Sequence, residues 1–486
     1  MNKNLLSFTF LMLFATSGKA QHLLSLDSCR TLALHNNKGI LIGHKKETAA
    51  HYEQKAAHTN LLPKLSFTGT YMHNSNSISL LSNRQEQALS QLGTSLQEQL
   101  KDGILQVSNI LPPNWASLLQ LIEKTDIVSP LNSFGQRIND FLRTDTRDIW
   151  GGTINLTQPI YMGGKITAYN LIAKQLHEVA GWEYEQKRQS IILATDEAYW
   201  QVLSLTYKKR LAEDYFNLVK TLENDIYKLV DAGMATHAEK LAVGVKVNEA
   251  EMTLSQVENG LALSRMNLCQ LCGLPLYDSI RLSDENLYSS SASKTHPKED
   301  ISLAQSLRPE LQCLTLATHI YQEKIRLAKS EHLPSIALTG NFFFSNPSLL
   351  NGFERKFRGT WNIGILVNVP LFHWGEGVYK IKKAQAEAHI AQYELEEAKE
   401  LVTLQIQQAV YQSKEAYKRL NLTNRNIGKA QENLRIANLG FKEGIIPSFQ
   451  VMEAQTAWFS AQSAHIDALI NIQMTETILQ KAKGEL

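Results

Sequence analysis

The chain has 486 residues, and its 49 Lys and Arg nearly balance its 47 Asp and Glu, so a nucleic acid or other polyanion partner is not expected. Only 12 Pro and 26 Gly occur in this length, which predicts a mainly helical chain. No run of about 18 apolar residues follows the first twenty positions, so a transmembrane helix is not expected and any membrane contact must use strands.

The first twenty residues have the layout of a secretory signal peptide. Lys3 precedes an apolar run from Leu5 to Phe14, and the small-residue exit Gly18-Lys19-Ala20 follows. We therefore expect residues 1–20 to be a signal peptide that is cleaved after Ala20. No Cys stands at the cleavage point, so no lipid anchor is expected there. The alternative is a buried N-terminal helix.

Residues 27–59 hold many Ala and no Pro, which predicts one long helix that ends at Leu62-Pro63. Apolar and polar residues then alternate, which predicts a strand at about 63–72. The stretch 73–147 is amphipathic on both sides of Ile110-Leu111-Pro112-Pro113 and is expected to form short helices.

A second alternating stretch predicts a strand at about 149–160. Its length of about ten residues is enough to cross a bilayer when tilted, although a soluble sheet has the same period. Trp150 near one end, like Trp361 later in the chain, fits an aromatic girdle at a membrane interface, and the alternative is a core Trp.

The same signals recur at a constant offset. The pairs 211 residues apart are Trp150 and Trp361, Pro159 and Pro370, Gly233 and Gly444, and Gly273 and Gly484. This pattern predicts an internal duplication, with further strands at about 334–345 and 359–370. Leu62-Pro63 and Leu333-Pro334 are 271 residues apart instead, so 60 extra residues must lie within the insert at 73–147.

Each second strand is followed by nearly seventy residues without Pro. A helix of that length spans about 100 Å and needs lateral partners, which indicates coiled-coil packing. Turns at 232–236 and 443–448 end these helices. Gly233 and Gly444 suit helix C-terminal caps and Thr236 and Ser448 suit N-caps, so each copy should form an antiparallel hairpin.

In the last helix, Ala recurs at heptad spacing, which allows close approach of a neighbouring helix; the alternative is chance in an Ala-rich helix. These positions are Ala454, Ala457, Ala461, Ala464 and Ala468. The Ser-rich stretch 288–298 reads as an exposed linker. It divides the mature chain into a first repeat at 21–287 and a second at 299–486.

No site for a metal, a cofactor or catalysis is expected. Cys269 and Cys272 form a C-x-x-C pair without a second ligand pair, and we interpret them as small apolar residues near a helix end. His44, His51 and His58 are seven residues apart, too far for one ion, and indicate a polar stripe. The chain also lacks a nucleophile elbow and a phosphate loop, so we expect no enzyme.

Four strands cannot close a barrel and lipid tolerates no open sheet edge, so an oligomer must pool them. The chain resembles the TolC-like outer membrane factors, also called outer membrane efflux proteins, over essentially its whole mature length. Besides the Leu-Pro junctions, the strand-end turns and the hairpin turns, the motifs that carry the resemblance are Leu24-Ser25-Leu26-Asp27, Ala33-Leu34-His35-Asn36-Asn37 and Ala304-Gln305-Ser306-Leu307-Arg308-Pro309-Glu310.

The resemblance implies a homotrimer in the outer membrane of a Gram-negative bacterium, with a twelve-stranded barrel and a periplasmic helical tunnel. It implies a passive exit duct of a tripartite efflux pump or type I secretion system. The duct would dock to a periplasmic adaptor protein and an inner-membrane transporter through the hairpin turns, at Gly233, Thr236, Gly444, Pro447 and Ser448. The insert would lie outside the cell, as a partial cap of the pore or as an inert elaboration.

The resemblance also implies a gate at the periplasmic mouth, close to the hairpin turns. Alignment on the turn glycines gives Glu239, Gln450 and Glu453 as candidates for a cation-favouring ring, and the alternative is solvated helix faces. Some members lock the mouth with an Arg where this chain has Ile446. Hydrophobic contacts of Ile445, Ile446 and Phe449 are therefore expected to hold it, so that Ile446→Ser should change the conductance.

One alternative function is a periplasmic coiled-coil scaffold or adaptor without a membrane barrel. Adaptors need a further domain with many short strands, which this sequence lacks. Fractionation of the outer membrane and heat-modifiable migration of a trimer would separate the two functions.

Overall fold

The structure is a computed structural model. It describes residues 22–75, 78–79, 81–107, 125–144, 146–286, 301–348 and 354–486. The predicted signal peptide at 1–20, the linker at 288–298 and residues 110–113 of the insert lie outside the described residues. The chain divides into two compact units. The helical unit consists of Met1–Ala57, Thr167–Ala328 and Glu376–Leu486, and the sheet unit consists of His58–Ile166 and Lys329–Gly375.

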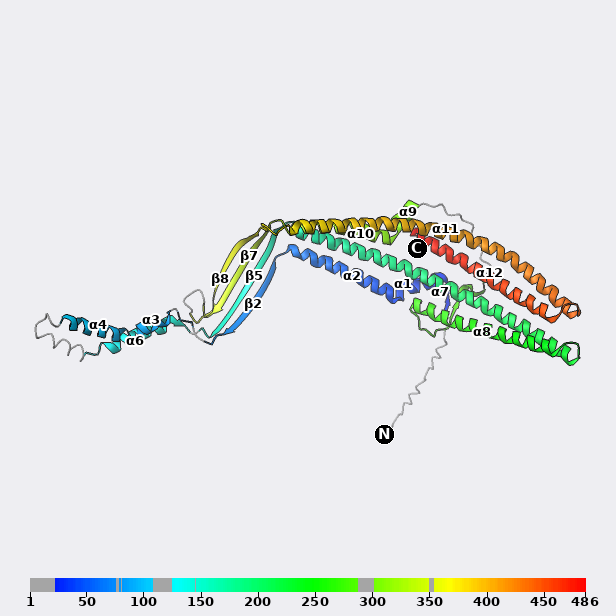
Figure 1. The fold of residues 1–486 in the computed structure, drawn as a ribbon, viewed down its shortest axis with the longest axis horizontal. Helices are drawn as coiled ribbons and strands as arrows, with labels where there is room; N and C mark the ends of the chain where they lie inside the picture. Colours follow the sequence, from blue (N-terminus) through cyan, green and yellow to red (C-terminus); the bar gives the residue numbers. More distant parts are fainter. Residues whose placement is uncertain are drawn as a thin grey trace, which may run out of the picture. The chain divides into compact units, whose positions relative to one another are not determined.

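The sheet unit contains a four-stranded antiparallel sheet in the order β2-β5-β7-β8 (Figure 1). Its strands are β2 (Lys64–His73), β5 (Asp148–Met162), β7 (Ser335–Asn346) and β8 (Arg358–Asn368), each within two residues of a predicted strand. Strands β2 and β8 are the edges of the described sheet. All residues of both edge strands are exposed, including large apolar ones such as Phe67 and Ile363.

The described part of the insert contains the short helices that the sequence predicts. They are α3 (Asn83–Ser90), α4 (Leu92–Val107) and α6 (Val128–Leu142). The side chain of Asn132 joins α6 to α4, because its Oδ1 accepts from the N–H of Gly93 at 2.7 Å. The two-residue strands β3 (Ile78–Ser79) and β4 (Arg143–Thr144) pair at the base of the insert.

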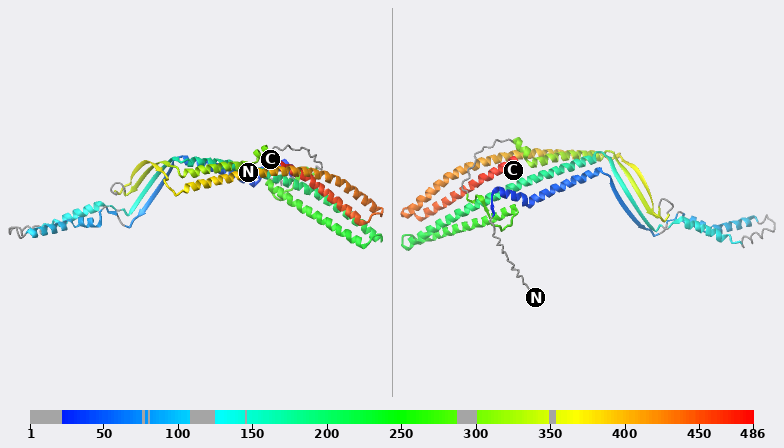
Figure 2. Two further views of the ribbon diagram at one scale, coloured as in Figure 1. Left: turned by 45° about the horizontal axis from the view of Figure 1, so that its top comes forward. Right: turned by 180° about the vertical axis from the view of Figure 1, so that it is seen from behind.

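The helical unit is built on two antiparallel hairpins, which Figure 2 shows from two further sides. The first joins α7 (Lys165–Asp231) to α8 (His237–Cys272), and the second joins α11 (Glu376–Lys442) to α12 (Ser448–Lys483). Helices α7 and α11 have 67 residues each, and α8 and α12 have 36 each. Among the described helices, none combines the length and the apolar character that crossing a membrane requires.

The predicted heptad of Ala on α12 is buried only in part. Ala454, Ala461 and Ala468 are buried, whereas Ala457 is exposed and Ala464 is half-buried. The buried members are seven residues apart and lie along one stripe of the helix, as a coiled-coil seam requires. Helix α12 packs along α11 and also contacts α8.

The prediction of one long helix over 27–59 is wrong, because two helices occupy this stretch. Helix α1 (Leu26–Asn36) ends before Asn37, and α2 (Lys38–His58) begins after it. The extended backbone of Asn37 interrupts the helix, and its side chain stabilises the break. Asn37 Nδ2 donates to the carbonyl of Leu271 at 3.0 Å, and Oδ1 accepts from the N–H of Gly39 at 2.8 Å.

The N-terminal segment is tied to the end of the first hairpin. Strand β1 (His22–Leu24), which the sequence did not reveal, pairs in parallel with β6 (Ile280–Leu282). The short helices η3 (Ser283–Asn286) and α9 (Ile301–Leu307) follow, and α10 (Pro309–Ser330) leads back to the sheet unit. Tyr199 is buried in the core here and donates to Asp284 Oδ2 at 2.6 Å.

Candidate functional site

The turns of the two hairpins have the geometry that their glycines predict. Gly233 has φ of +72° and Gly444 has φ of +71°, the left-handed conformation that suits glycine. After each glycine, the next N–H bonds back across the turn, from Met234 to the carbonyl of Leu229 and from Ile445 to that of Gly440, both at 2.8 Å. Both helices therefore end in a Schellman motif, which satisfies carbonyls that the helix leaves unpaired.

Glu239, a predicted gate residue, takes part in a capping box at the start of α8. Thr236 is the N-cap, as predicted, and its Oγ1 accepts from the N–H of Glu239 at 3.2 Å. In return, Glu239 Oε2 accepts from the N–H of Thr236 at 2.8 Å and from its hydroxyl at 3.0 Å. These bonds satisfy free N–H groups of the first helical turn and fix the carboxylate beside the turn.

The prediction that Ser448 caps α12 is wrong. Pro447 is the N-cap, with φ of −75° and ψ of 156°, and the buried Ser448 is the first helical residue. The hydroxyl of Ser448 is therefore free of capping and donates to Glu239 Oε1 at 3.1 Å. This hydrogen bond joins the turns of the two hairpins.

These hydrogen bonds lower the pKa of Glu239. Hydrogen bonds from the backbone N–H of Thr236, then from its hydroxyl and from the hydroxyl of Ser448, hold the pKa of Glu239 below its usual range. The carboxylate is therefore ionised at neutral pH. Gln450 and Glu453 are exposed on α12, and no hydrogen bond or ion pair described in the structure joins either to Glu239.

The three apolar gate candidates lie in different surroundings. Ile445 is 78% exposed and Phe449 is 54% exposed. Ile446 instead packs inside its own hairpin, where a Cβ added at Gly440 would lie 2.6 Å from the Cδ1 of Ile446. A changed conductance of Ile446→Ser would therefore not identify a gate, because the substitution also removes packing under the turn. Ile445→Ser is the sharper test of hydrophobic closure.

Sequence reasoning missed a contact that stabilises the first hairpin. The ammonium of Lys240 lies 4.1 Å from the centre of the Tyr227 ring, and the Tyr227 hydroxyl donates to Glu223 Oε1 at 3.2 Å. Tyr227 and Lys240 lie at similar distances from Gly233 on opposite sides of the turn. Antiparallel pairing of the two helices about Gly233 could have predicted that these two side chains lie close together.

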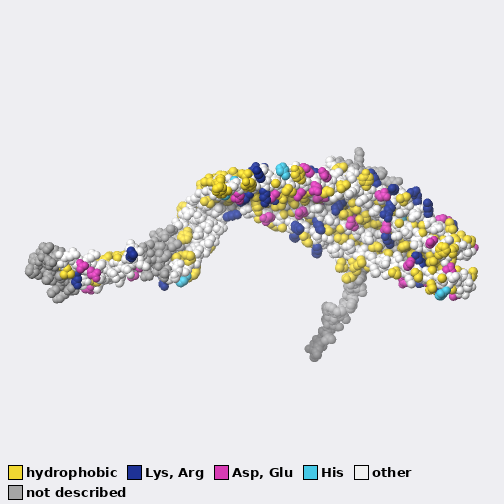
Figure 3. Space-filling model, in the orientation of Figure 1, with side chains coloured by type: hydrophobic (Ala, Val, Ile, Leu, Met, Phe, Trp, Pro, Cys, Tyr) yellow, Lys and Arg dark blue, Asp and Glu magenta, His cyan; other side chains and the backbone are white. Residues whose placement is uncertain are grey.

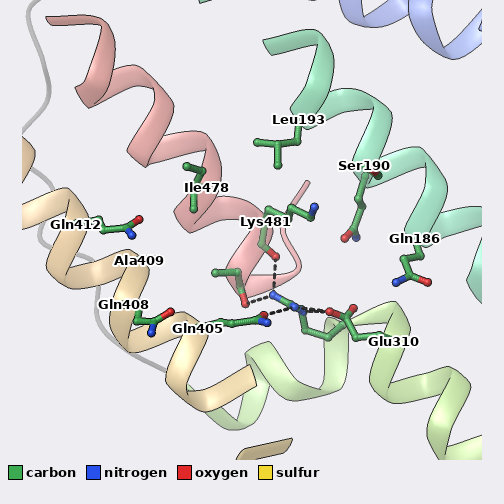
Figure 4. A pocket seen from close by; sticks show the side chains of 13 residues that line it. Gln186, Ser190, Leu193, Glu310, Gln405, Gln408, Ala409, Gln412, Ile478 and Lys481 are labelled. Carbon is green, nitrogen blue, oxygen red and sulfur yellow. Dashed lines mark hydrogen bonds and ion pairs between the residues drawn. The ribbon is translucent and has the colours of Figure 1, made fainter. Parts of the chain in front are cut away.

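A polar cavity of about 500 Å³ lies between α7, α11 and the C-terminal end of α12 (Figure 4). Its lining is rich in amides, from Gln186, Gln189, Gln405, Gln408 and Gln412. The buried Arg308 at its base bonds to Glu310 and donates to Gln405 Oε1 at 2.7 Å and to the carbonyl of Ala482 at 3.1 Å. Arg308 thus holds the end of α12, a structural role that the sequence motif did not reveal.

Cys269 and Cys272 lie at the end of α8, and the histidines of the predicted stripe lie on α2. Cys29, Cys269 and Cys272 are buried in one core cluster, and Cys272 Sγ donates to the carbonyl of Cys29 at 3.7 Å. Burial raises the pKa of the Cys269 thiol. His51 lies beside His177 of α7, with ring centres 5.1 Å apart. Within the described part of the chain, no group of three or more His, Cys, Asp or Glu could hold a metal ion.

The girdle candidates Trp150 and Trp361 are exposed on the sheet. Trp150 packs against Tyr71 of the neighbouring strand, with ring centres 4.4 Å apart. Trp361 is 71% exposed and lies on the edge strand β8. Neither is a core residue of the chain.

Solved structures define the class of fold. The chain is similar to the outer membrane protein VceC of Vibrio cholerae, with a TM-score of 0.69 and 15% identity over 94% of this chain and 96% of that one. It is also similar to the Campylobacter jejuni CmeC outer membrane channel, with a TM-score of 0.70 and 17% identity over 95% of this chain and 85% of that one. The fold is therefore that of outer membrane channels.

The family follows from the sequence. The model of the outer membrane efflux protein family matches residues 131–274 and 301–485, so the chain belongs to this family. Its relatives include the outer membrane protein TolC of Vibrio cholerae, 22% identical over 70% of this chain and 77% of the relative. TolC of Escherichia coli is 23% identical over 69% of each chain.

Proposed function

We propose that three copies of this chain form an export duct in the outer membrane of a Gram-negative bacterium. Each copy gives its four strands to one twelve-stranded barrel and its two hairpins to a periplasmic tunnel. The observation that carries this proposal is the sheet, in which both edge strands lack a partner among the described residues and expose large apolar side chains. Water does not suit the apolar side chains of such a sheet, and lipid does not tolerate its open edges. Pairing with other copies closes the edges, so that lipid can cover the apolar side chains.

The duct is built from two repeats, at 21–287 and 299–486, after removal of the signal peptide. The equal lengths of α7 and α11 and of α8 and α12 support this division, since each repeat then supplies one strand pair and one hairpin. The insert lies outside the cell, because it joins β2 and β5 at the ends away from the helices. Trp150 and Trp361 form part of an aromatic girdle at a membrane interface.

The duct catalyses nothing and takes its energy from partners. Its turns dock a periplasmic adaptor and, through it, an inner-membrane transporter. A relative named alkaline protease secretion protein AprF, from Pseudomonas aeruginosa, is 20% identical over 67% of each chain. The toluene efflux pump outer membrane protein TtgC of Pseudomonas putida is 25% identical over 36% of each. The first name supports polypeptide secretion, and the second supports small-molecule efflux.

Cell fractionation and electrophoresis test the duct directly. The protein is expected in the outer membrane fraction and should migrate in SDS as a trimer that heating converts to a monomer. Purified trimer added to a planar bilayer should conduct ions. A monomer recovered from the periplasm would instead support the alternative of a periplasmic scaffold or adaptor.

Loss of the Ser448 hydroxyl is expected to raise the mean conductance of the duct. The Ser448→Ala variant loses the hydrogen bond to Glu239 Oε1 that joins the two turns at what we propose is the periplasmic mouth. Conductance in planar bilayers measures the effect. The control is Ser460→Ala, which removes an exposed hydroxyl from the same helix, away from the turn. Equal conductance of Ser448→Ala and the parent would argue against a closing role for this bond.

Acid is expected to open the same contact. The pKa of Glu239 is lowered in the folded protein, so its stabilisation of the turns is complete above the ordinary Glu pKa of about 4.3 and is lost as the pH falls through the lower folded value. Conductance should therefore rise as the pH falls below about 4. The Glu239→Gln variant, which keeps a capping partner but cannot ionise, should lack this step. The same step in the variant would assign it to other groups.

A further inference from the structure

Two equivalent segments of the sheet unit have different surroundings. Pro159–Gly164 follows the core of β5, and Pro370–Gly375 occupies the same place after β8, 211 residues later. Within the chain β5 stays paired with β7 as far as Met162, which lies opposite Ser335. Strand β8 ends at Asn368, five residues before His373, the counterpart of Met162. The shorter strand is the one whose outer edge has no partner in the described sheet.

One position in these segments carries very different residues in the same backbone conformation. Gly163 has φ of +62°, and its counterpart Trp374 has φ of +49°. Glycine adopts this left-handed conformation freely, whereas a bulky side chain there is strained. A Cβ at Gly163 would lie 2.7 Å from the Cβ of Leu333 and 2.8 Å from the carbonyl oxygen of Ser330. The contact of this turn with Ser330 and Leu333 thus has no room for the side chain that Trp374 carries.

The segment after β8 is strongly apolar and exposed. Leu371 is 90% exposed and Trp374 is 88% exposed, and the ring of Trp374 lies 4.9 Å from that of Phe372. Hydrophobic side chains gather at this end of the sheet (Figure 3). At the other edge of the sheet, Leu61 and Leu62 precede β2 and are also exposed. Leu62 is the counterpart of Leu333, 271 residues earlier.

We propose that Trp374 of one copy packs on Leu62 of the next copy and that Phe372 packs on Leu65, where β8 of the first copy meets β2 of the second. This inference rests on the proposed trimer. The internal pairing of β5 with β7 supplies the register, in which Tyr161 lies opposite Ile336. The same register, applied between β8 of one copy and β2 of the next, sets Phe372 opposite Leu65. Strand β8 would then continue beyond Asn368, where it ends within one chain.

The seam between copies then differs from the seam inside a copy. Leu333 closes directly on Gly163 within the chain, whereas Leu62 of the neighbouring copy must stand back from Trp374 by the thickness of an indole ring. The ring fills that space and excludes water. An obligate contact of this kind gives a physical reason for keeping a strained aromatic residue at an exposed turn.

The Trp374→Gly variant tests the proposal by its effect on the heat resistance of the trimer in SDS. A Trp374 that makes no contact between copies and a Trp374 that makes one predict effects of opposite sign. Glycine relieves the left-handed strain at φ of +49°, so a Trp374 without that contact predicts a trimer that is as resistant to heat in SDS as the parent, or more so. The proposal predicts a lower dissociation temperature, since the indole leaves a gap in the seam. Leu371→Ala, at an equally exposed neighbour, is the matched control and should change little.

Cysteine cross-linking separates failure of this contact from failure of the trimer. A chain with Leu62→Cys and Trp374→Cys should form covalent oligomers with a short bifunctional thiol reagent, because the two positions adjoin opposite edges of one sheet and the missing indole leaves a gap between them. Asn368→Cys with Thr68→Cys is the reference pair, since the same register sets these residues opposite each other. Cross-linking of the reference pair alone would overturn the inference and leave the barrel intact.

Failure of both pairs would overturn the barrel and the contact together. The remaining outcome places the indole in lipid. Phospholipids with brominated chains would then quench the fluorescence of the parent protein more than that of Trp374→Gly, and the Leu62 and Trp374 pair would not cross-link. That result would assign Trp374 to the membrane surface and overturn the inference.

Discussion

The Asp196→Ala variant is expected to lose about 3–5 kcal/mol of unfolding free energy. Asp196 is completely buried on α7, and both of its oxygens accept from Arg30 of α1, from Nε at 2.8 Å and from Nη2 at 2.6 Å. Removal of the carboxylate leaves the guanidinium without its main partner in a place where water can reach it only in part. Thermal or denaturant unfolding of the detergent-solubilised protein measures the loss.

Asp27 offers the matched control for this variant. Its carboxylate also lies near Arg30, at 3.5 Å, but its side chain is 91% exposed, so Asp27→Ala should cost less than about 1 kcal/mol. Equal losses for Asp27→Ala and Asp196→Ala would show that the buried pair has no special role. Arg30→Ala should resemble Asp196→Ala, because it leaves the carboxylate buried without its main partner.

Gly163→Ala is expected to destabilise the sheet unit by about 2–5 kcal/mol. Left-handed backbone costs an L residue about 1–2 kcal/mol, and overpacking adds about 1–3 kcal/mol. The second cost arises because the new Cβ would lie 2.7 Å from the Cβ of Leu333 and 2.8 Å from the carbonyl oxygen of Ser330, an atom of the backbone that yields little. Heating in SDS, with the temperature of trimer dissociation as readout, measures the effect.

Gly164, the next residue, offers a control that separates the cost of left-handed backbone from the cost of overpacking. Gly164 also has positive φ, of +84°, but a Cβ there would meet no atom within 4 Å. Gly164→Ala should therefore show the backbone cost alone. If the two variants lose the same stability, the close approach of Leu333 and Ser330 contributes nothing.

Much of the fold could be predicted from the sequence, because its signals are local. Alternation of apolar residues marks β2 and β8, and the glycines at 233 and 444 mark the ends of α7 and α11. The break at Asn37 could not be predicted in this way. The groups that stabilise it include the carbonyl of Leu271, which is 234 residues away in the chain. A break held by such a distant partner leaves no local pattern.

The candidate site shows the same division. The capping box of Thr236 and Glu239 is a local motif, with the spacing that such boxes require. The bond from Ser448 to Glu239 joins residues 209 positions apart, and it exists because Pro447 takes the capping place that Ser448 was expected to fill. The roles of Ile445 and Ile446 differ because one side chain packs on Gly440 and the other points away.

The matched lengths of the hairpin helices restrict how such a protein can change in size. One residue added to α7 would rotate everything after it by about 100° and advance its turn by about 1.5 Å, so Glu239 would leave Ser448. A change that preserves this meeting must enter α7, α8, α11 and α12 together and in whole heptads. The four hairpin helices must therefore lengthen or shorten together, in steps of about 10 Å, and none of them can change its length alone.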